Sequence, residues 1–425
     1  MDTSLISGWL PWTLRVLAVA AVTAALLRVS PFWLRRRLPW VVGGALAGTA
    51  LIALLVALSG VADEPLPTGL WFWVCCALLG LGGLAAGVRR SSWWNLAAVP
   101  LAVLLSLVCA ANSVNISTGY YPSVDAAVGD LSDAPVPQQM GLDEALAAVG
   151  KSSAGRVVSV DIPAEPSGFK HRHELVYLPP AWFRSKTRPK LPVVVMIGGQ
   201  FAAPDNWIRA GEAIKTADAY AAAHNGYAPI LVMADATGSF KTDTECVNGK
   251  AGRAADHLVK DIPAYLTKTF NSASDARSWS AVGWSMGGTC AVDLAVVHPE
   301  VIGSFVDISG DAGPNLGGKQ STVDQLYGGD EAAWAAHDPV TVLGKAKKDT
   351  YRNSAGYFMI GDQETGRHLA DAQTLDKAAR AAGLTTTLEV HPGKHDWQFG
   401  TFAFKQTLPW LAQRAGLPGA GGAAG

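Results

Sequence analysis

The chain has 425 residues, of which 49% are hydrophobic and 16% are charged, and its formal net charge is −1. Without an excess of basic residues, this composition excludes a protein that binds nucleic acid through a broadly positive surface. The charged fraction is also low for an entirely soluble protein. Charged residues are scarce up to about Ala111 and more frequent afterwards, so we predict two units of different character.

Four apolar stretches follow one another at roughly 10–29, 40–62, 70–88 and 94–111. Each is close to the ~20 residues that an α-helix needs to cross the hydrocarbon core of a bilayer. A cleaved signal peptide would be a single, shorter apolar stretch behind a basic start. We therefore predict an all-α transmembrane anchor of four helices over residues 1–111.

The loops between these stretches predict how the anchor is oriented. Arg35–Arg37 lie between the first and second stretches, and Arg89 and Arg90 lie between the third and fourth. The middle loop carries Asp63 and Glu64 instead. The positive-inside rule places the arginine loops in the cytoplasm. We therefore expect a multi-pass protein of the cell membrane whose second half is extracytoplasmic.

Residues 112–140 are rich in turn formers, show little periodicity and are expected to be a linker. Residues 141–415 are expected to form one catalytic domain, and the Gly/Ala-rich segment 416–425 a disordered tail. Within the domain we predict strands at about 157–162, 174–178, 191–197, 230–234, 279–284, 304–309, 357–360 and 385–391. Helices are expected at 206–224, 254–270, 286–298, 370–382 and 398–413, the second of them interrupted or bent near Pro263. Strands that alternate with helices predict an α/β fold with a mostly parallel sheet covered on both faces.

A G-x-S-x-G motif, Gly283-Trp284-Ser285-Met286-Gly287, stands between the predicted strand 279–284 and a predicted helix. In a nucleophile elbow the serine occupies a strained turn, and glycines let the strand and the helix pass closely. The start of the helix then supplies a backbone N–H for a developing oxyanion. Ser285 is therefore the candidate nucleophile.

A serine hydroxyl becomes a good nucleophile only when a base takes its proton. In folds with a nucleophile elbow, this base is a histidine that follows the last strand. His395 stands in that position, in Gly393-Lys394-His395-Asp396-Trp397. His391 competes with it, but it lies at the end of the predicted strand beside Pro392. We predict His395 as the base.

The third member of a triad is an acid, which is expected just after strand 357–360. Two carboxylates compete there, in Gly361-Asp362-Gln363-Glu364. We favour Glu364, and Asp362 is the alternative.

The loop after strand 191–197 is expected to supply the second oxyanion donor. It begins Gly198-Gly199-Gln200-Phe201, and its glycines allow the backbone to approach a ligand closely. We predict the backbone N–H groups of Gln200 and Met286 as the donors. Phe201 and Trp397 are candidate substrate contacts, and a packed core position is the alternative for Phe201.

Cysteine spacing gives no zinc signature, and we predict neither a metal nor an organic cofactor. Cys246 and Cys290 lie in the second half of the chain. If that half is outside the cytoplasm, they can form a disulfide, provided that the fold brings them together.

These motifs resemble the esterase branch of the α/β-hydrolases, which includes the bacterial mycolyltransferases, esterase D and the feruloyl esterases. The matching segments are GGQFAAPDNW, AVGWSMGGTCAVDLAVVHPE, WAAHDP, MIGDQE and GKHDWQFG, spread over roughly 191–404. The resemblance implies the α/β-hydrolase fold, with Ser285 as nucleophile, Glu364 as acid and His395 as base. It does not cover the predicted anchor.

We therefore expect a serine esterase that acts through an acyl-serine intermediate on lipid or cell-envelope esters. One alternative is an acyltransferase of mycolyltransferase type, which moves the acyl group to a sugar or lipid alcohol. The other is a non-catalytic membrane scaffold with a degenerate hydrolase domain.

Overall fold

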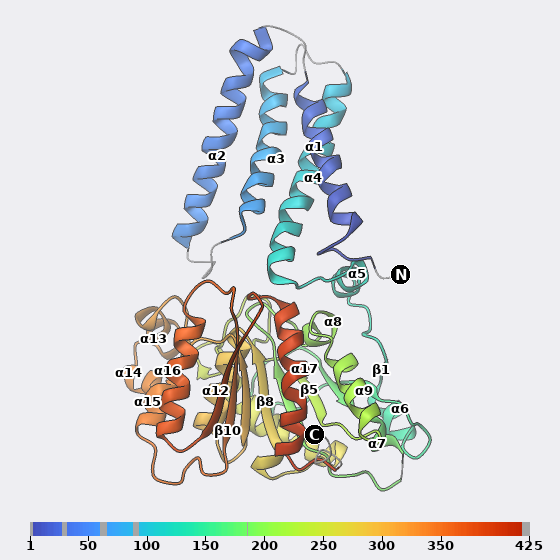
Figure 1. The fold of residues 1–425 in the computed structure, drawn as a ribbon, viewed down its shortest axis with the longest axis vertical. Helices are drawn as coiled ribbons and strands as arrows, with labels where there is room; N and C mark the ends of the chain where they lie inside the picture. Colours follow the sequence, from blue (N-terminus) through green and yellow to red (C-terminus); the bar gives the residue numbers. More distant parts are fainter. Residues whose placement is uncertain (1–2, 28–31, 60–65, 88–92, 185, 419–425) are drawn as a thin grey trace. The chain divides into compact units, whose positions relative to one another are not determined.

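The computed structural model describes residues 3–27, 32–59, 66–87, 93–184 and 186–418. The chain forms two compact units, Met1–Asp133 and Ala134–Gly425 (Figure 1). Arg89, Arg90, Asp63 and Glu64, on which the predicted orientation partly depends, lie outside the described residues. Residues 419–425 of the expected tail also lie outside them.

The first unit contains four helices that are long and apolar enough to cross a membrane, as predicted. They are α1 (Trp9–Leu26), α2 (Leu38–Ser59), α3 (Thr68–Gly87) and α4 (Trp93–Thr118). A π-helical turn, Trp33–Arg37, leads into α2 and carries the first arginine cluster.

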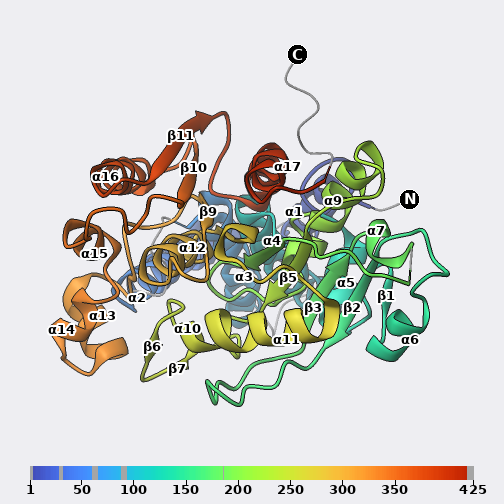
Figure 2. The same ribbon diagram turned by 90° about the horizontal axis from the view of Figure 1, so that it is seen from below.

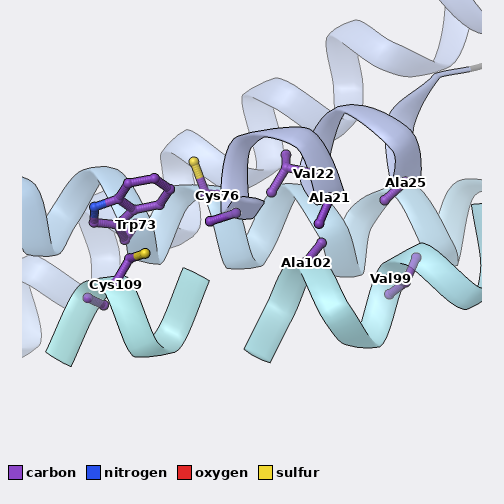
Figure 3. Close-up of a cluster of buried hydrophobic side chains, with 10 residues drawn as sticks. Ala21, Val22, Ala25, Trp73, Cys76, Val99, Ala102 and Cys109 are labelled. Atoms are coloured by element: carbon purple, nitrogen blue, oxygen red, sulfur yellow. The ribbon is translucent and has the colours of Figure 1, made fainter. Parts of the chain in front are cut away.

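Small side chains bring these helices together. Helix α4 packs against α1 and α3, and α2 packs against α3. The buried cluster contains Ala18, Ala21, Val22 and Ala25 of α1, Trp73 and Cys76 of α3, and Val99, Ala102, Cys109 and Ala110 of α4 (Figure 3). Small residues allow close backbone approach where apolar surroundings provide no hydrophobic drive between helices. On α2, large apolar side chains such as Leu55 and Leu58 are exposed, as expected for a surface that faces lipid.

The segment expected as a linker contains regular structure instead. Helix α4 continues to Thr118, and a short helix, α5 (Val124–Leu131), follows. Ser123 caps α5, since its hydroxyl accepts a hydrogen bond from the backbone N–H of Ala126 at 3.2 Å. Strand β1 (Gln139–Met140) then joins the sheet of the second unit. Local capping and strand pairing thus order a stretch that lacks a hydrophobic period.

The second unit is built on a nine-stranded sheet in the order β1-β2-β3-β5-β4-β8-β9-β10-β11. Strand β3 is antiparallel to both β2 and β5, and the other neighbours are parallel. The strands after β1 are β2 (Arg156–Val160), β3 (Glu174–Leu178), β4 (Val193–Ile197), β5 (Ile230–Ala234), β8 (Trp279–Trp284), β9 (Ser304–Ile308), β10 (Ala355–Gly361) and β11 (Thr385–His391). This confirms the predicted mostly parallel α/β fold.

Helices cover both faces of this sheet. Helices α9 (Ala213–Ala223) and α17 (Trp397–Arg414) lie on one face, and α11 (Ile262–Phe270) and α12 (Met286–Val297) lie on the other (Figure 2). Burial on both sides explains why the central strands β4, β5, β8 and β9 are buried along their whole length. The unit also contains the 14-residue helix α16 (His368–Ala381) and the shorter elements α6 (Leu142–Ala147), α7 (Pro180–Phe183), β6 (Asn248–Gly249), β7 (Gly252–Arg253), α13 (Lys319–Tyr327), α14 (Glu331–Ala335) and α15 (Pro339–Gly344).

Two predicted helices are interrupted. The helix predicted at 206–224 is split into α8 (Asn206–Arg209) and α9, with Glu212 in the left-handed region at φ 47°. A Cβ on Gly211 would lie only 2.8 Å from Trp207 and 3.1 Å from the ring of Trp397, so the break leaves no room for a side chain at this position. The helix predicted at 254–270 consists of α10 (Ala254–Asp256), a π-helical stretch (His257–Asp261) and α11.

A disulfide joins Cys246 to Cys290, two buried residues whose Cα atoms are 5.5 Å apart. Cys290 lies on α12, and Cys246 lies in the loop that follows β5. The bond therefore ties this loop to the helix that begins after Ser285.

Removing this cross-link should lower stability. The bond closes a loop of 44 residues, which corresponds to about 4 kcal/mol in a chain-entropy estimate. We expect Cys246→Ala/Cys290→Ala to lower the thermal midpoint of the detergent-solubilised protein, whereas Cys75→Ala, which removes a free cysteine, should have little effect. Equal midpoints for the double variant and the oxidised wild type would contradict a stabilising disulfide.

Candidate active site

The candidate nucleophile occupies a sharp turn between β8 and α12. Ser285 has φ 58° and ψ −126°, an unusual conformation for a residue with a side chain. A Cβ on Gly283 would lie 1.7 Å from the carbonyl oxygen of Gly287, and one on Gly287 would lie 2.2 Å from that of Ile197. Both glycines are therefore required for the turn, and the backbone N–H of Ser285 donates to Ile308 at 2.8 Å. The surrounding sheet holds the strained residue in place.

His395 lies beside this serine, although 110 residues separate them in the chain. Its Nε2 is 2.9 Å from the Oγ of Ser285. The histidine belongs to the loop between β11 and α17, and its side chain is mostly buried. The two residues that were predicted to interact are thus brought within hydrogen-bonding distance.

Glu364 faces the other ring nitrogen of His395. Its Oε2 is 3.4 Å from the Nδ1 of His395. Its Oε1 accepts hydrogen bonds from the hydroxyl of Ser309 at 2.5 Å and from the backbone N–H of Gly361 at 2.7 Å. These contacts fix the carboxylate and leave one oxygen directed at the imidazole.

Asp362, the alternative acid, is placed differently. Its side chain is exposed, and Oδ1 accepts from the backbone N–H of Gly393 at 3.2 Å. The turn after β10 therefore directs Glu364, rather than Asp362, towards His395.

The contacts of Glu364 favour its ionised form. Burial alone would raise its pKa, but hydrogen bonds from His395 and Ser309, together with the nearby imidazole, lower the pKa below its usual value. An ionised carboxylate at this position stabilises a positively charged His395.

The loop after β4 lies directly against the nucleophile. A Cβ on Gly199 would be only 3.3 Å from that of Ser285. Gln200 follows in this loop, and its side-chain amide donates to Asp243 at 3.1 Å. Met286 is the first residue of α12, so the helix itself cannot satisfy its backbone N–H. Gln200 and Met286 thus stand on the two segments that converge on Ser285.

An ion pair between the half-buried Arg172 and the buried Asp235, which the sequence analysis did not identify, supports this loop. The guanidinium of Arg172 donates to Asp235 at 2.7 Å and to the carbonyl oxygen of Ala202 at 2.9 Å. Burial would raise the pKa of Asp235, but Arg172 lowers it overall. The only sign of this pair in the sequence is the charged residue Asp235 just after β5, and its partner Arg172 stands 63 residues away in the chain.

Aromatic rings enclose the imidazole of His395. His368, for which no role was predicted, stacks on it with ring centroids 4.6 Å apart, and Trp284 lies at 5.1 Å.

Trp397 was predicted to contact the substrate, but it is fully buried and packs against Trp284 and Trp207. That prediction is wrong, because the start of α17 turns the ring into the core. Phe201 is 41% exposed, as a substrate contact requires.

Two groups of side chains have the composition of a metal site. The first, Glu364, His368 and His395, overlaps the candidate triad. The second is His171, Glu174 and His257. Both ring nitrogens of His171 lie 2.8 Å from backbone carbonyl oxygens, so each already has a hydrogen-bond partner within the protein.

Comparisons with known proteins agree with this geometry. Residues 170–411 match the model of the Esterase family, described as "Putative esterase". An uncharacterized protein of Corynebacterium glutamicum is 31% identical over 95% of this chain and 96% of its own length, so the likeness includes both units.

Solved structures share the fold of the second unit. A ferulic acid esterase aligns with a TM-score of 0.52 and 20% identity over 61% of this chain and 99% of its own. An S-formylglutathione hydrolase from Agrobacterium tumefaciens aligns with a TM-score of 0.51 and 18% identity over 61% of this chain and 95% of its own. These likenesses support the α/β-hydrolase fold.

The lowered pKa of Glu364 predicts a pH dependence of stability. Its contribution to stability is fully present above the pKa of about 4.5 that a glutamate has in the unfolded chain, and is lost as the pH falls through the lower pKa of the folded state. We expect the thermal midpoint of Glu364→Gln to fall less steeply below pH ~4.5 than that of the wild type. Asp362→Asn removes a neighbouring charge as a control, and equal flattening by both variants would contradict the assignment.

Proposed function

The chain belongs to the Esterase family, and we propose that it is an enzyme that hydrolyses carboxylic esters through an acyl-Ser285 intermediate. One observation carries the proposal: the Nε2 of His395 lies 2.9 Å from the Oγ of Ser285, while the Nδ1 of the same ring faces Glu364. This is the relation between nucleophile, base and acid that activates a serine.

In the first half of the reaction, His395 takes the proton of Ser285 as its Oγ attacks the ester carbonyl carbon. The backbone N–H groups of Gln200 and Met286 stabilise the oxyanion. The bond between the carbonyl carbon and the alcohol oxygen then breaks, and His395 donates the proton that it took from Ser285 to that oxygen. In the second half, His395 takes a proton from water, the resulting hydroxide attacks the acyl carbon, and Ser285 is released with its proton restored.

The first unit supports a location in the cell membrane with the catalytic unit outside the cytoplasm. Its four helices have the length and composition of membrane spans, and the arginine cluster 35–37 favours the cytoplasm. The disulfide between Cys246 and Cys290 is an independent argument, because such bonds persist in oxidising compartments.

An anchored enzyme encounters substrates of the same membrane or envelope at a raised effective concentration. We therefore propose lipid or cell-envelope esters as the substrates.

Substitutions within the triad test the enzymatic proposal. We expect Ser285→Ala to abolish labelling by a fluorophosphonate probe and hydrolysis of p-nitrophenyl acetate by the detergent-solubilised chain. Glu364→Gln should lower kcat by about 10⁴, the scale found when a triad acid is neutralised, whereas Asp362→Asn should change it by less than about threefold. A wild type that neither labels nor hydrolyses the ester would instead favour a non-catalytic scaffold.

Cysteine labelling tests the proposed orientation. Lys347→Cys introduces a thiol at an exposed position of the catalytic unit, and Leu34→Cys introduces one beside the arginines without removing their charge. An impermeant maleimide should label the first variant on intact cells and the second only after lysis, with the wild type as background. The reverse pattern would overturn the orientation.

A further inference from the structure

Two exposed aromatic side chains of the second unit lie against each other on loops near the candidate site. Among its described residues, five large hydrophobic side chains are exposed, namely Leu146, Phe201, Phe240, Leu369 and Val390. The two aromatic members, Phe201 and Phe240, lie against each other with ring centroids 5.2 Å apart. Phe240 is the most exposed of the five, at 65%. Paired exposed rings, unlike apolar side chains scattered singly over a surface, offer adjoining apolar area to a ligand.

One member of the pair, Phe201, stands on the loop that abuts the nucleophile, and Phe240 stands on the loop after β5. Phe201 comes two residues after Gly199, whose Cβ position lies 3.3 Å from the Cβ of Ser285. Its backbone is in the left-handed region, with φ 63°. Such a conformation is uncommon for a bulky residue and is retained where the surroundings impose it. The loop after β4 therefore places the ring of Phe201 at the edge of the site.

Several contacts fix the loop that carries Phe240. Asp235 accepts hydrogen bonds from the backbone N–H groups of Thr237 and Gly238, at 3.1 and 3.0 Å, while it is paired with Arg172. The hydroxyls of Ser239 and Thr242 on either side of Phe240 lie 2.7 Å apart.

Further along, the loop that carries Phe240 is tied both to the loop of Gln200 and to helix α12. The carboxylate of Asp243 accepts from the side chain of Gln200, and Cys246 is bonded to Cys290 on α12. The exposed ring of Phe240 thus belongs to a braced segment. A surface that is fixed before binding loses little conformational entropy when a ligand covers it.

We propose that Phe201 and Phe240 form a platform that binds the acyl chain of the substrate, and that this chain is an apolar one of several carbons. The inference rests on the proposed esterase function. The alcohol oxygen must lie beside His395, which returns a proton to it. The carbonyl oxygen must lie against the loop of Gln200, and the residue after Gln200 is Phe201. The alcohol leaves past His395, whereas the acyl group stays bonded to Ser285 beside the loop of Gln200 and Phe201, so the acyl side is the part assigned to the aromatic pair.

Chain-length dependence tests the platform in the detergent-solubilised full-length protein. We expect Phe240→Ala to lower kcat/KM for p-nitrophenyl octanoate about tenfold, since burial against one aromatic ring is lost. Its kcat/KM for p-nitrophenyl acetate should stay within about twofold of the wild type, because an acetyl group is too short to cover the ring. Phe240→Leu, which retains an apolar side chain, should restore most of the octanoate activity.

Leu146→Ala is the matched control, because it removes an exposed apolar side chain from α6, which packs on β2 towards the edge of the sheet. It should leave both esters unaffected. Equal losses on acetate and octanoate, or no loss on octanoate, would overturn the platform while leaving the esterase function intact. A wild type that hydrolyses neither ester would overturn both proposals together.

Discussion

The strained turn at Ser285 is the constraint on which the rest of the site depends. The turn requires that no side chain be present at Gly283 or Gly287, where the backbone of neighbouring segments leaves no room. It also requires a rigid frame, because a residue with φ 58° persists only where its surroundings impose that conformation. The parallel strands β4, β8 and β9 provide this frame, and the start of α12 provides the local electrostatic field.

The sheet also accounts for the separation of the triad along the chain. Parallel neighbours end at the same edge, so residues that follow β8, β10 and β11 meet although long segments separate them. Glu364 stays ionised there because Ser309, Gly361 and His395 supply hydrogen bonds. Hydrogen bonds also hold the loop of Gln200. Arg172 pairs with the buried Asp235 and donates to the carbonyl oxygen of Ala202 in this loop.

Local patterns were sufficient to predict the eight longer strands, the serine and the histidine, because each depends on residues within a few positions. The two-residue strands β1, β6 and β7 were not predicted. Glu364 and Asp362 could be ranked but not separated, since the direction of each side chain depends on the turn after β10. Trp397 was misassigned because its sequence neighbours do not reveal which side of α17 faces the core. The Cys246–Cys290 bond, the Arg172–Asp235 pair and the stacking of His368 on His395 all join distant segments, and only the assembled fold brings these together.

The central claim is that Ser285 carries the acyl group during turnover. The most direct measurement is mass spectrometry of the protein after acid quenching during hydrolysis of an activated ester, followed by peptide mapping. We expect the mass of one acyl group on the peptide that contains Ser285, and its disappearance when the substrate is exhausted. Turnover without such an adduct, or with the acyl group on a different residue, would contradict the account.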